Sequence, residues 1–239
     1  MSAKTNRGDR TRELILDVAE RLFAHNGPSA VTVRTIATAA GINTQAVNYH
    51  FGSKDRLFEE MFTRRIGPVN RERLERLAAC VDGKRSIRLE DVVDAFVRPI
   101  LRLRQESLGH ERALVVMQFQ ARAIANPGEF EFEYLRAHFE PVRSRFISAL
   151  CAMLPELGIE DVIWRYNMMC GAILYSMAGP MRMLHLPESH AGAKLQDVDN
   201  EAAAIDNLVR FLCGGFRAAS LYREARPAAR VTRLRARAR

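Results

Sequence analysis

The chain has 239 residues, of which 48% are hydrophobic and 27% charged, with a formal net charge of +8. This composition is ordinary for a folded globular protein and excludes a chain that is disordered over its whole length. The longest stretch without a charged residue, Tyr166 to Met181, contains Gly179 and Pro180 and is too short and too broken to span a bilayer. The polar start, Met1 to Arg12, has no apolar segment behind it, so we expect no signal peptide and no membrane partner.

The charge is concentrated at the two ends of the chain. Residues 1–65 carry ten basic and seven acidic side chains, and residues 223–239 carry seven arginines and one glutamate. Residues 66–222, in contrast, are nearly neutral, with nineteen basic and twenty acidic side chains. Such basic ends favour a polyanionic partner. We expect residues 223–239 to be disordered, either attracting phosphates non-specifically or remaining a solvated tail without a role.

Apolar residues recur at helical spacing through most of the chain. In the first such segment, residues 14–23, the pattern is expected to end at Asn26-Gly27-Pro28. Beyond residue 83 we expect helices at 88–106, 110–125, 129–153, 159–179 and 201–219, the third of them kinked at Pro141, and a long polar loop at about 184–200. No alternating strand pattern and no internal repeat is found. The sequence therefore predicts an all-α protein of about nine helices, a small N-terminal bundle followed by a larger C-terminal one.

Residues 32–51 have the spacing of a helix-turn-helix. Thr32 is a suitable N-cap for a first short helix, Gly41 suits a turn with positive φ, and Asn43 can cap a second helix at 44–51. The small Ala37 allows the two helices to cross closely. A further helix is expected to start near Lys54, after Gly52-Ser53, and to be kinked or interrupted at Gly67-Pro68.

The outer face of the second short helix carries side chains that can read a major groove. These are Thr44, Gln45, Asn48 and Tyr49. Gln and Asn can pair bidentately with adenine, Thr offers a hydroxyl and a methyl, and Tyr reaches a phosphate or a thymine methyl. Lys54, beside the free amides of a helix N-terminus, suits a phosphate. The alternatives are that this face is only solvated and that the three short helices form a plain core.

Residues 12–62 resemble the DNA-binding domain of the TetR family of bacterial transcriptional regulators. The resemblance is carried by Ile15-Leu16, Ala19, Leu22-Phe23, Gly27, Thr32, Ile36-Ala37, Ala40-Gly41-Ile42, Tyr49-His50-Phe51, Lys54 and Leu57. The run from Val47 to Phe51 is similar to a branch that includes regulators with a CerR-like C-terminal domain. The resemblance implies DNA contacts from Thr32, Arg34, Thr44, Gln45, Ala46, Asn48, Tyr49, His50 and Lys54. Asn48 stands where the family commonly has Tyr, so the base preference there is not implied, and His50 could instead pack against the next helix.

The resemblance also implies a homodimer formed through the last two helices and a small-molecule pocket in the C-terminal half. Candidate interface residues are Ile163, Tyr166, Cys170, Ile205, Leu208, Val209, Leu212 and Phe216. Candidate pocket residues, chosen because Met and aromatic side chains often line apolar pockets, are Met117, Phe119, Phe139, Phe146, Trp164, Met168, Tyr175 and Met177. In both sets the alternative is that the residues belong to the internal core.

No pattern indicates catalysis, a metal site or redox chemistry. The cysteines are Cys80, Cys151, Cys170 and Cys213. They form no C-x-x-C pair, so we expect reduced, mostly buried thiols in a cytoplasmic protein rather than a redox sensor. His185 and His190 lie near Glu188 without a supporting ligand cluster, and the common catalytic and nucleotide-binding motifs are absent. We therefore expect no catalytic residue, metal or cofactor.

The predicted organisation is a DNA-binding domain at 8–68, a regulatory and dimerisation domain at 69–222, and a basic tail at 223–239. The predicted function is a ligand-responsive repressor that binds a palindromic operator of double-stranded DNA as a homodimer and leaves it when a small molecule binds. Repression is the default of the family, and the effector, operator and regulated genes are not encoded in the sequence. An all-α carrier or enzyme and a helical protein–protein adaptor are the alternatives from other classes, and both leave the helix-turn-helix spacing unexplained.

Overall fold

The computed structural model describes residues 7–82, 87–102, 129–178 and 201–220, and within these ranges it contains eight α-helices and no strand. The helices are α1 (Arg7–Ala30), α2 (Val33–Ala40), α3 (Thr44–Phe51), α4 (Lys54–Asp82), α5 (Leu89–Arg102), α7 (Glu129–Met153), α8 (Ile159–Ala178) and α9 (Glu201–Arg217). The predicted all-α class is confirmed. The helix expected at 110–125, the loop at 184–200 and the tail at 223–239 lie outside the described residues.

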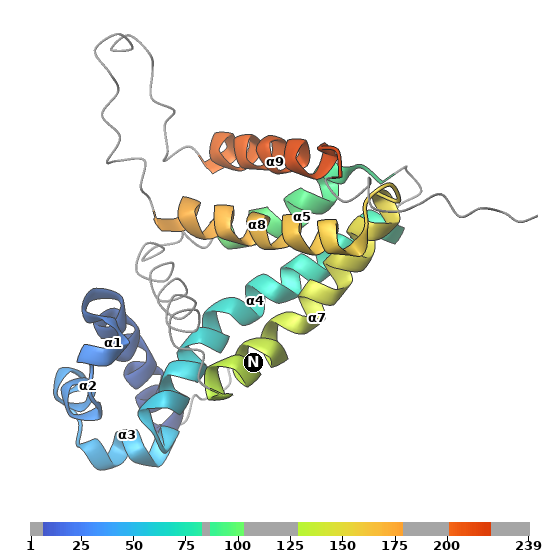
Figure 1. Ribbon diagram of the computed structural model, residues 1–239. Helices are drawn as coiled ribbons and strands as arrows, with labels where there is room; N and C mark the ends of the chain where they lie inside the picture. Colours follow the sequence, from blue (N-terminus) through green and yellow to red (C-terminus); the bar gives the residue numbers. More distant parts are fainter. Residues whose placement is uncertain (1–6, 83–86, 103–128, 179–200, 221–239) are drawn as a thin grey trace, which may run out of the picture.

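The helices form two groups joined by α4 (Figure 1). At one end of the molecule, α1, α2 and α3 pack together around the first turns of α4. Beyond that group α4 continues between α5 and α7, while α8 and α9 cover the far end. Because α4 has 29 residues, it spans roughly 43 Å and belongs to both groups.

Three prolines interrupt the helices less than the sequence suggested. The α1 helix does not end at Asn26-Gly27-Pro28 but reaches Ala30, and α4 runs through Pro68 and α7 through Pro141 without a break. Proline removes one backbone hydrogen bond but holds φ near the helical value. Packing of α4 against α1, α5 and α7 compensates for that loss in its case, so α4 is not interrupted at Gly67-Pro68. The kinks expected at Pro68 and Pro141 stay predictions.

One hydrophobic core follows α4 from the first group of helices into the second. Near α1 it contains Phe23, whose ring lies 4.9 Å from that of Phe58. Further along, α5 places Phe96 against Phe146 of α7, with ring centroids 4.9 Å apart. The apolar stripe expected on 201–219 is buried against α5. The two groups of helices therefore share a packed interior.

The orientation of α9 on α8 is held by Arg165. Its guanidinium donates hydrogen bonds to the carbonyl oxygens of Gly215, Phe216 and Ala218, at 3.1, 2.7 and 2.9 Å, and to that of Ala219. These carbonyls lie at and just beyond the C-terminal end of α9, where a cation is well placed. The arrangement fixes which faces of α8 and α9 point away from the core.

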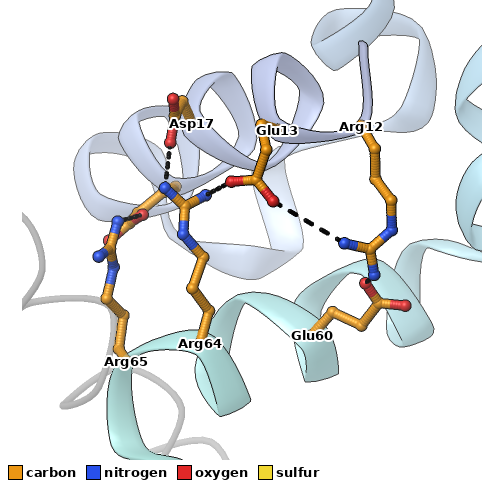
Figure 2. Close-up of polar contacts among 7 residues, drawn as sticks. Arg12, Glu13, Asp17, Glu60, Arg64 and Arg65 are labelled. Atoms are coloured by element: carbon orange, nitrogen blue, oxygen red, sulfur yellow. Dashed lines mark hydrogen bonds and ion pairs between the residues drawn. The ribbon is translucent and has the colours of Figure 1, made fainter. Parts of the chain in front are cut away.

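A ladder of ion pairs joins α1 to α4 (Figure 2). Arg64 contacts Asp17 and Glu13, and Arg12 contacts Glu60. Arg65 forms two hydrogen bonds with the carboxylate of Glu20. The Arg65–Glu20 pair is buried, with side-chain exposures of 12% and 6%, whereas the others are partly exposed. These contacts make α1 and the start of α4 one body, so a displacement of α4 carries the first group of helices with it.

Candidate nucleic-acid interface

The α2–α3 pair has the helix-turn-helix geometry that the sequence predicts. At the start of α2 the Thr32 and Thr35 side chains each accept a hydrogen bond from the other residue's backbone N–H. Gly41 ends α2 with φ 67°, and the Asn43 side chain caps α3 by accepting from the N–H of Ala46 at 2.7 Å. All three predicted capping positions are confirmed. Together they set the angle at which α3 leaves the turn.

The inner faces of the two helices are closed by small and apolar side chains. Ile36 and Ala37 of α2 are buried, as are Val47 and Phe51 of α3. Ala37 is 1% exposed, and the N–H of Ile42 bonds its carbonyl at 3.0 Å, so the turn lies directly on α2. Since one side of α3 is fixed in the core, its opposite side is held rigidly toward solvent.

The exposed side of α3 carries the residues predicted to read DNA. Thr44, Gln45, Asn48 and Tyr49 are all exposed, and Tyr49 is 86% exposed. The Tyr49 ring lies edge-on to the ring of His50, with centroids 5.2 Å apart, and His50 is half-buried. No acidic residue occurs in α3. This face therefore offers hydrogen-bonding groups without a negative charge to repel phosphates.

The remaining predicted contacts surround this face. Arg34 is exposed at the start of α2 and forms no ion pair with the residues that the structure describes. Thr32 is exposed but is occupied in capping, and Ala46 is half-buried. Lys54 donates from Nζ to the carbonyl of Val31 at 3.0 Å, which ties the start of α4 to the loop before α2. The structure thus brings all nine predicted DNA-binding residues to one region.

Two family models match this chain. "Bacterial regulatory proteins, tetR family" matches residues 15–61, and "Tetracyclin repressor-like, C-terminal domain" matches residues 94–215, about half of the chain. The chain belongs to the TetR family. It is accordingly a DNA-binding transcriptional regulator and not an enzyme. The CerR-like form of the C-terminal domain stays a prediction.

Relatives of the chain include two transcriptional repressors. The HTH-type transcriptional repressor KstR2 of Mycobacterium tuberculosis is 31% identical over 158 residues, which cover 63% of this chain and 68% of that one. The HTH-type transcriptional repressor AcnR of Corynebacterium efficiens is 28% identical over 166 residues, covering 64% and 88%.

Solved structures with the same fold include a TetR-family regulator from Bordetella parapertussis, at TM-score 0.59 and 18% identity over 84% of this chain and 93% of that one. The structure of KstR2 aligns at TM-score 0.55 and 19% identity over 88% and 98%. At these identities the likeness shows the fold alone.

In the C-terminal half of this TetR protein the burial differs from the prediction. Three residues expected to line a pocket, Trp164, Met168 and Tyr175, lie exposed on α8, at 58%, 65% and 62%. Five residues expected at the dimer interface are buried in the core of the single chain. They are Tyr166, Ile205, Val209, Leu212 and Phe216. Helical periodicity shows that α8 is apolar nearly all round but cannot say which of its sides faces outward, so the pocket and interface roles of these residues stay predictions.

The other predicted residues of this half have mixed environments. Ile163, Cys170 and Leu208 are half-buried. Phe146 is buried and Phe139 half-buried, so both lie in or against the core. Met117 and Phe119 lie outside the described residues, as does the side chain of Met177. One exposed side chain was missed, Phe211 of α9, which is 73% exposed and lies on the opposite side of its helix from the buried stripe.

The described residues hold no group of three metal-ligating side chains, and none of their helices is long and apolar enough to cross a membrane. His185, Glu188 and His190 lie outside them. The four cysteines are free, and burial raises the pKa of each thiol, that of Cys213 to about 11. The thiols are therefore protonated near neutral pH and poor nucleophiles, as expected for structural cysteines.

Proposed function

We propose that the protein represses transcription by binding a palindromic operator as a homodimer, and that a small molecule releases it. One observation carries the proposal: the uncharged polar face of α3, held outward by a capped turn and a closed inner face. Two such helices related by a two-fold axis enter major grooves one helical turn, or a multiple of it, apart. The protein acts where its operator is, in the cytoplasm.

The dimer is supported by the outer surface of α8 and α9. The α8–α9 surface consists of Trp164, Met168 and Tyr175 of α8 and Phe211 of α9. Positions 164, 168 and 175 are four and seven residues apart and therefore share one helix face. Large apolar side chains gathered on adjacent exposed helices mark an interaction surface. We assign this surface, and not the buried stripes, to the contact between subunits.

Release is proposed to be a shift in population between two dimer arrangements. The α4 helix packs against α5 and α7 at one end and is tied to α1 by the ion pairs at the other. An effector that favours one position of α4 therefore also selects the separation of the two α3 helices. The pivot expected at Gly67-Pro68 is not required, because α4 is continuous there and acts as a lever.

Gln45→Ala and Asn48→Ala test the assignment of α3. Binding is measured by fluorescence anisotropy with the duplex upstream of the protein's own gene and with a scrambled duplex. Each bidentate base contact contributes about 1–3 kcal/mol, so each variant should bind the cognate duplex roughly tenfold to a hundredfold more weakly. Binding to the scrambled duplex, which depends on phosphate charge, should be unchanged and remain salt-dependent.

Ser144→Ala is the matched control, because Ser144 is an exposed polar residue of α7 far from α3 in sequence. It should bind both duplexes as the wild type does. If Gln45→Ala and Asn48→Ala also bind the cognate duplex normally, α3 is not the recognition helix.

A further inference from the structure

Four polar or charged side chains of the described residues are buried, and three of them are matched by neighbours. Glu20 pairs with Arg65, and Asp161 accepts from the Ser220 hydroxyl and pairs with Arg165. Asn70 donates to the carbonyl of His138 at 3.0 Å. The fourth is Arg73, a cation in the middle of α4 that is 4% exposed.

The contacts of Arg73 are all with uncharged groups. Its Nε donates to the carbonyl of Phe96 at 2.8 Å, and Nη1 donates to Oδ1 of Asn70 at 3.2 Å. The guanidinium carbon lies 3.9 Å from the centre of the Phe96 ring. No carboxylate in the described part of the chain forms an ion pair with it. Within the described residues Arg73 is thus a buried charge without a counter-charge.

The titratable groups nearest to Arg73 do not neutralise it. They are Tyr166 and Cys170 of α8. Burial raises the pKa of both, so phenol and thiol are neutral near pH 7. Burial also lowers the pKa of Arg73 to about 10, which leaves the guanidinium charged at that pH.

Part of the guanidinium is still available. A guanidinium has five N–H donors, and the two hydrogen bonds above use two of them. Within the described part of the chain the hydrogen bonds of Arg73 use Nε and Nη1, which leaves Nη2 as the donor for an acceptor oxygen of a ligand.

We propose that Arg73 binds the carboxylate of the effector, and that the effector is an organic acid with an apolar or aromatic body. A buried, unpaired cation is unfavourable, and a planar guanidinium fork matches a carboxylate in both charge and geometry. The side chains around Arg73 are aromatic and apolar: the rings of Phe146 and Tyr166 lie 4.9 and 5.3 Å from that of Phe96, which itself lies under the guanidinium. The inference rests on the proposed effector response.

The position of Arg73 links this site to the DNA-binding end. Arg73 and Lys54 are both in α4, 19 residues apart, or roughly 28 Å along the helix axis. Through Arg73 and Asn70, α4 is bonded to α5 and α7. A carboxylate that binds Arg73 therefore acts on the helix whose position sets α3.

The test compares three head groups on the same apolar bodies, using the full-length protein without DNA. The probes are decanoate, decanamide and decylamine, and 3-phenylpropanoate with its amide and amine. Binding is measured by calorimetry, together with the shift in Tm. The wild type should bind a carboxylate of at least one series more than tenfold more tightly than the matched amide or amine. Arg73→Met should lose this preference, and Arg71→Met, at an exposed arginine of the same helix, should keep it.

Three results would overturn the proposal: no carboxylate binds the wild type, amides or amines bind as tightly, or Arg73→Met retains the preference. If Arg73→Met does not fold, Arg73→Lys replaces it. The Arg73→Lys variant should bind the carboxylate at least tenfold more weakly than the wild type, because an ammonium group lacks the planar fork. Unchanged affinity would contradict the proposal. Since these measurements contain no DNA, their failure is distinct from a failure to bind the operator.

Discussion

Phe211→Ala tests the proposed dimer surface most sharply. Phe211 is 73% exposed in the single chain, and full burial of such a side chain contributes about 1.5–3 kcal/mol. Burial of the exposed part would then contribute about 1–2 kcal/mol in each subunit, and about 2–4 kcal/mol in a dimer that contains two copies. The dissociation constant of the dimer should therefore rise roughly 30-fold to 1,000-fold.

The assay is sedimentation velocity over a wide dilution series, with the midpoint of dissociation compared between variants. Leu14→Ala is the control, because Leu14 is 43% exposed but lies on α1, in the first group of helices. It should dissociate as the wild type does. A Phe211→Ala protein whose dimer is as tight as that of the wild type would show that the α8–α9 surface is not the subunit contact.

The remaining predictions concern the turn, the α1–α4 ladder and the thiols. Gly41→Ala should lower the free energy of unfolding by roughly 1–2 kcal/mol in a urea titration, because φ is 67° there; no loss would contradict that geometry. Glu20→Gln should lower the free energy of unfolding by about 3–5 kcal/mol, because it leaves Arg65 buried without its charged partner. Arg12→Ala removes a half-exposed ion pair and should lower the free energy of unfolding by about 1 kcal/mol or less. Equal losses in the Glu20→Gln and Arg12→Ala variants would refute the distinction between the buried and the exposed pair. Cys213 should react slowly with a disulfide reagent at neutral pH and faster toward pH 11; rapid reaction in the folded protein at pH 7 would contradict its burial.

The part of the fold that sequence rules describe well is the part governed by local chemistry. The caps at Thr32 and Asn43 and the turn at Gly41 depend on hydrogen bonds and backbone angles within a few residues, and all were predicted correctly. The helix expected at 129–153 has those bounds in the structure. Proline was given too much weight, because at Pro68 packing on both sides of α4 stabilises a helix that would be broken in isolation.

The burial of residues in the C-terminal half depends on tertiary packing, which helical periodicity does not contain. The residues of α8 are apolar on nearly every side, so periodicity could not distinguish Tyr166, which is buried, from Trp164, which is exposed. Arg73 gives no signal in the sequence either, since a single arginine in a polar, charged helix suggests a solvated position. Its burial follows from the close approach of α5 to α4, which no local rule contains.

The central claim is that two α3 helices enter the major groove of one duplex. Methylation protection by dimethyl sulfate on the DNA upstream of the protein's own gene tests it directly, because guanine N7 lies in the major groove and adenine N3 in the minor groove. We predict protection of guanine N7 in two symmetric patches separated by about 10 base pairs or a multiple of that. Protection of adenine N3 alone, or a single patch without a symmetric counterpart, would contradict the account.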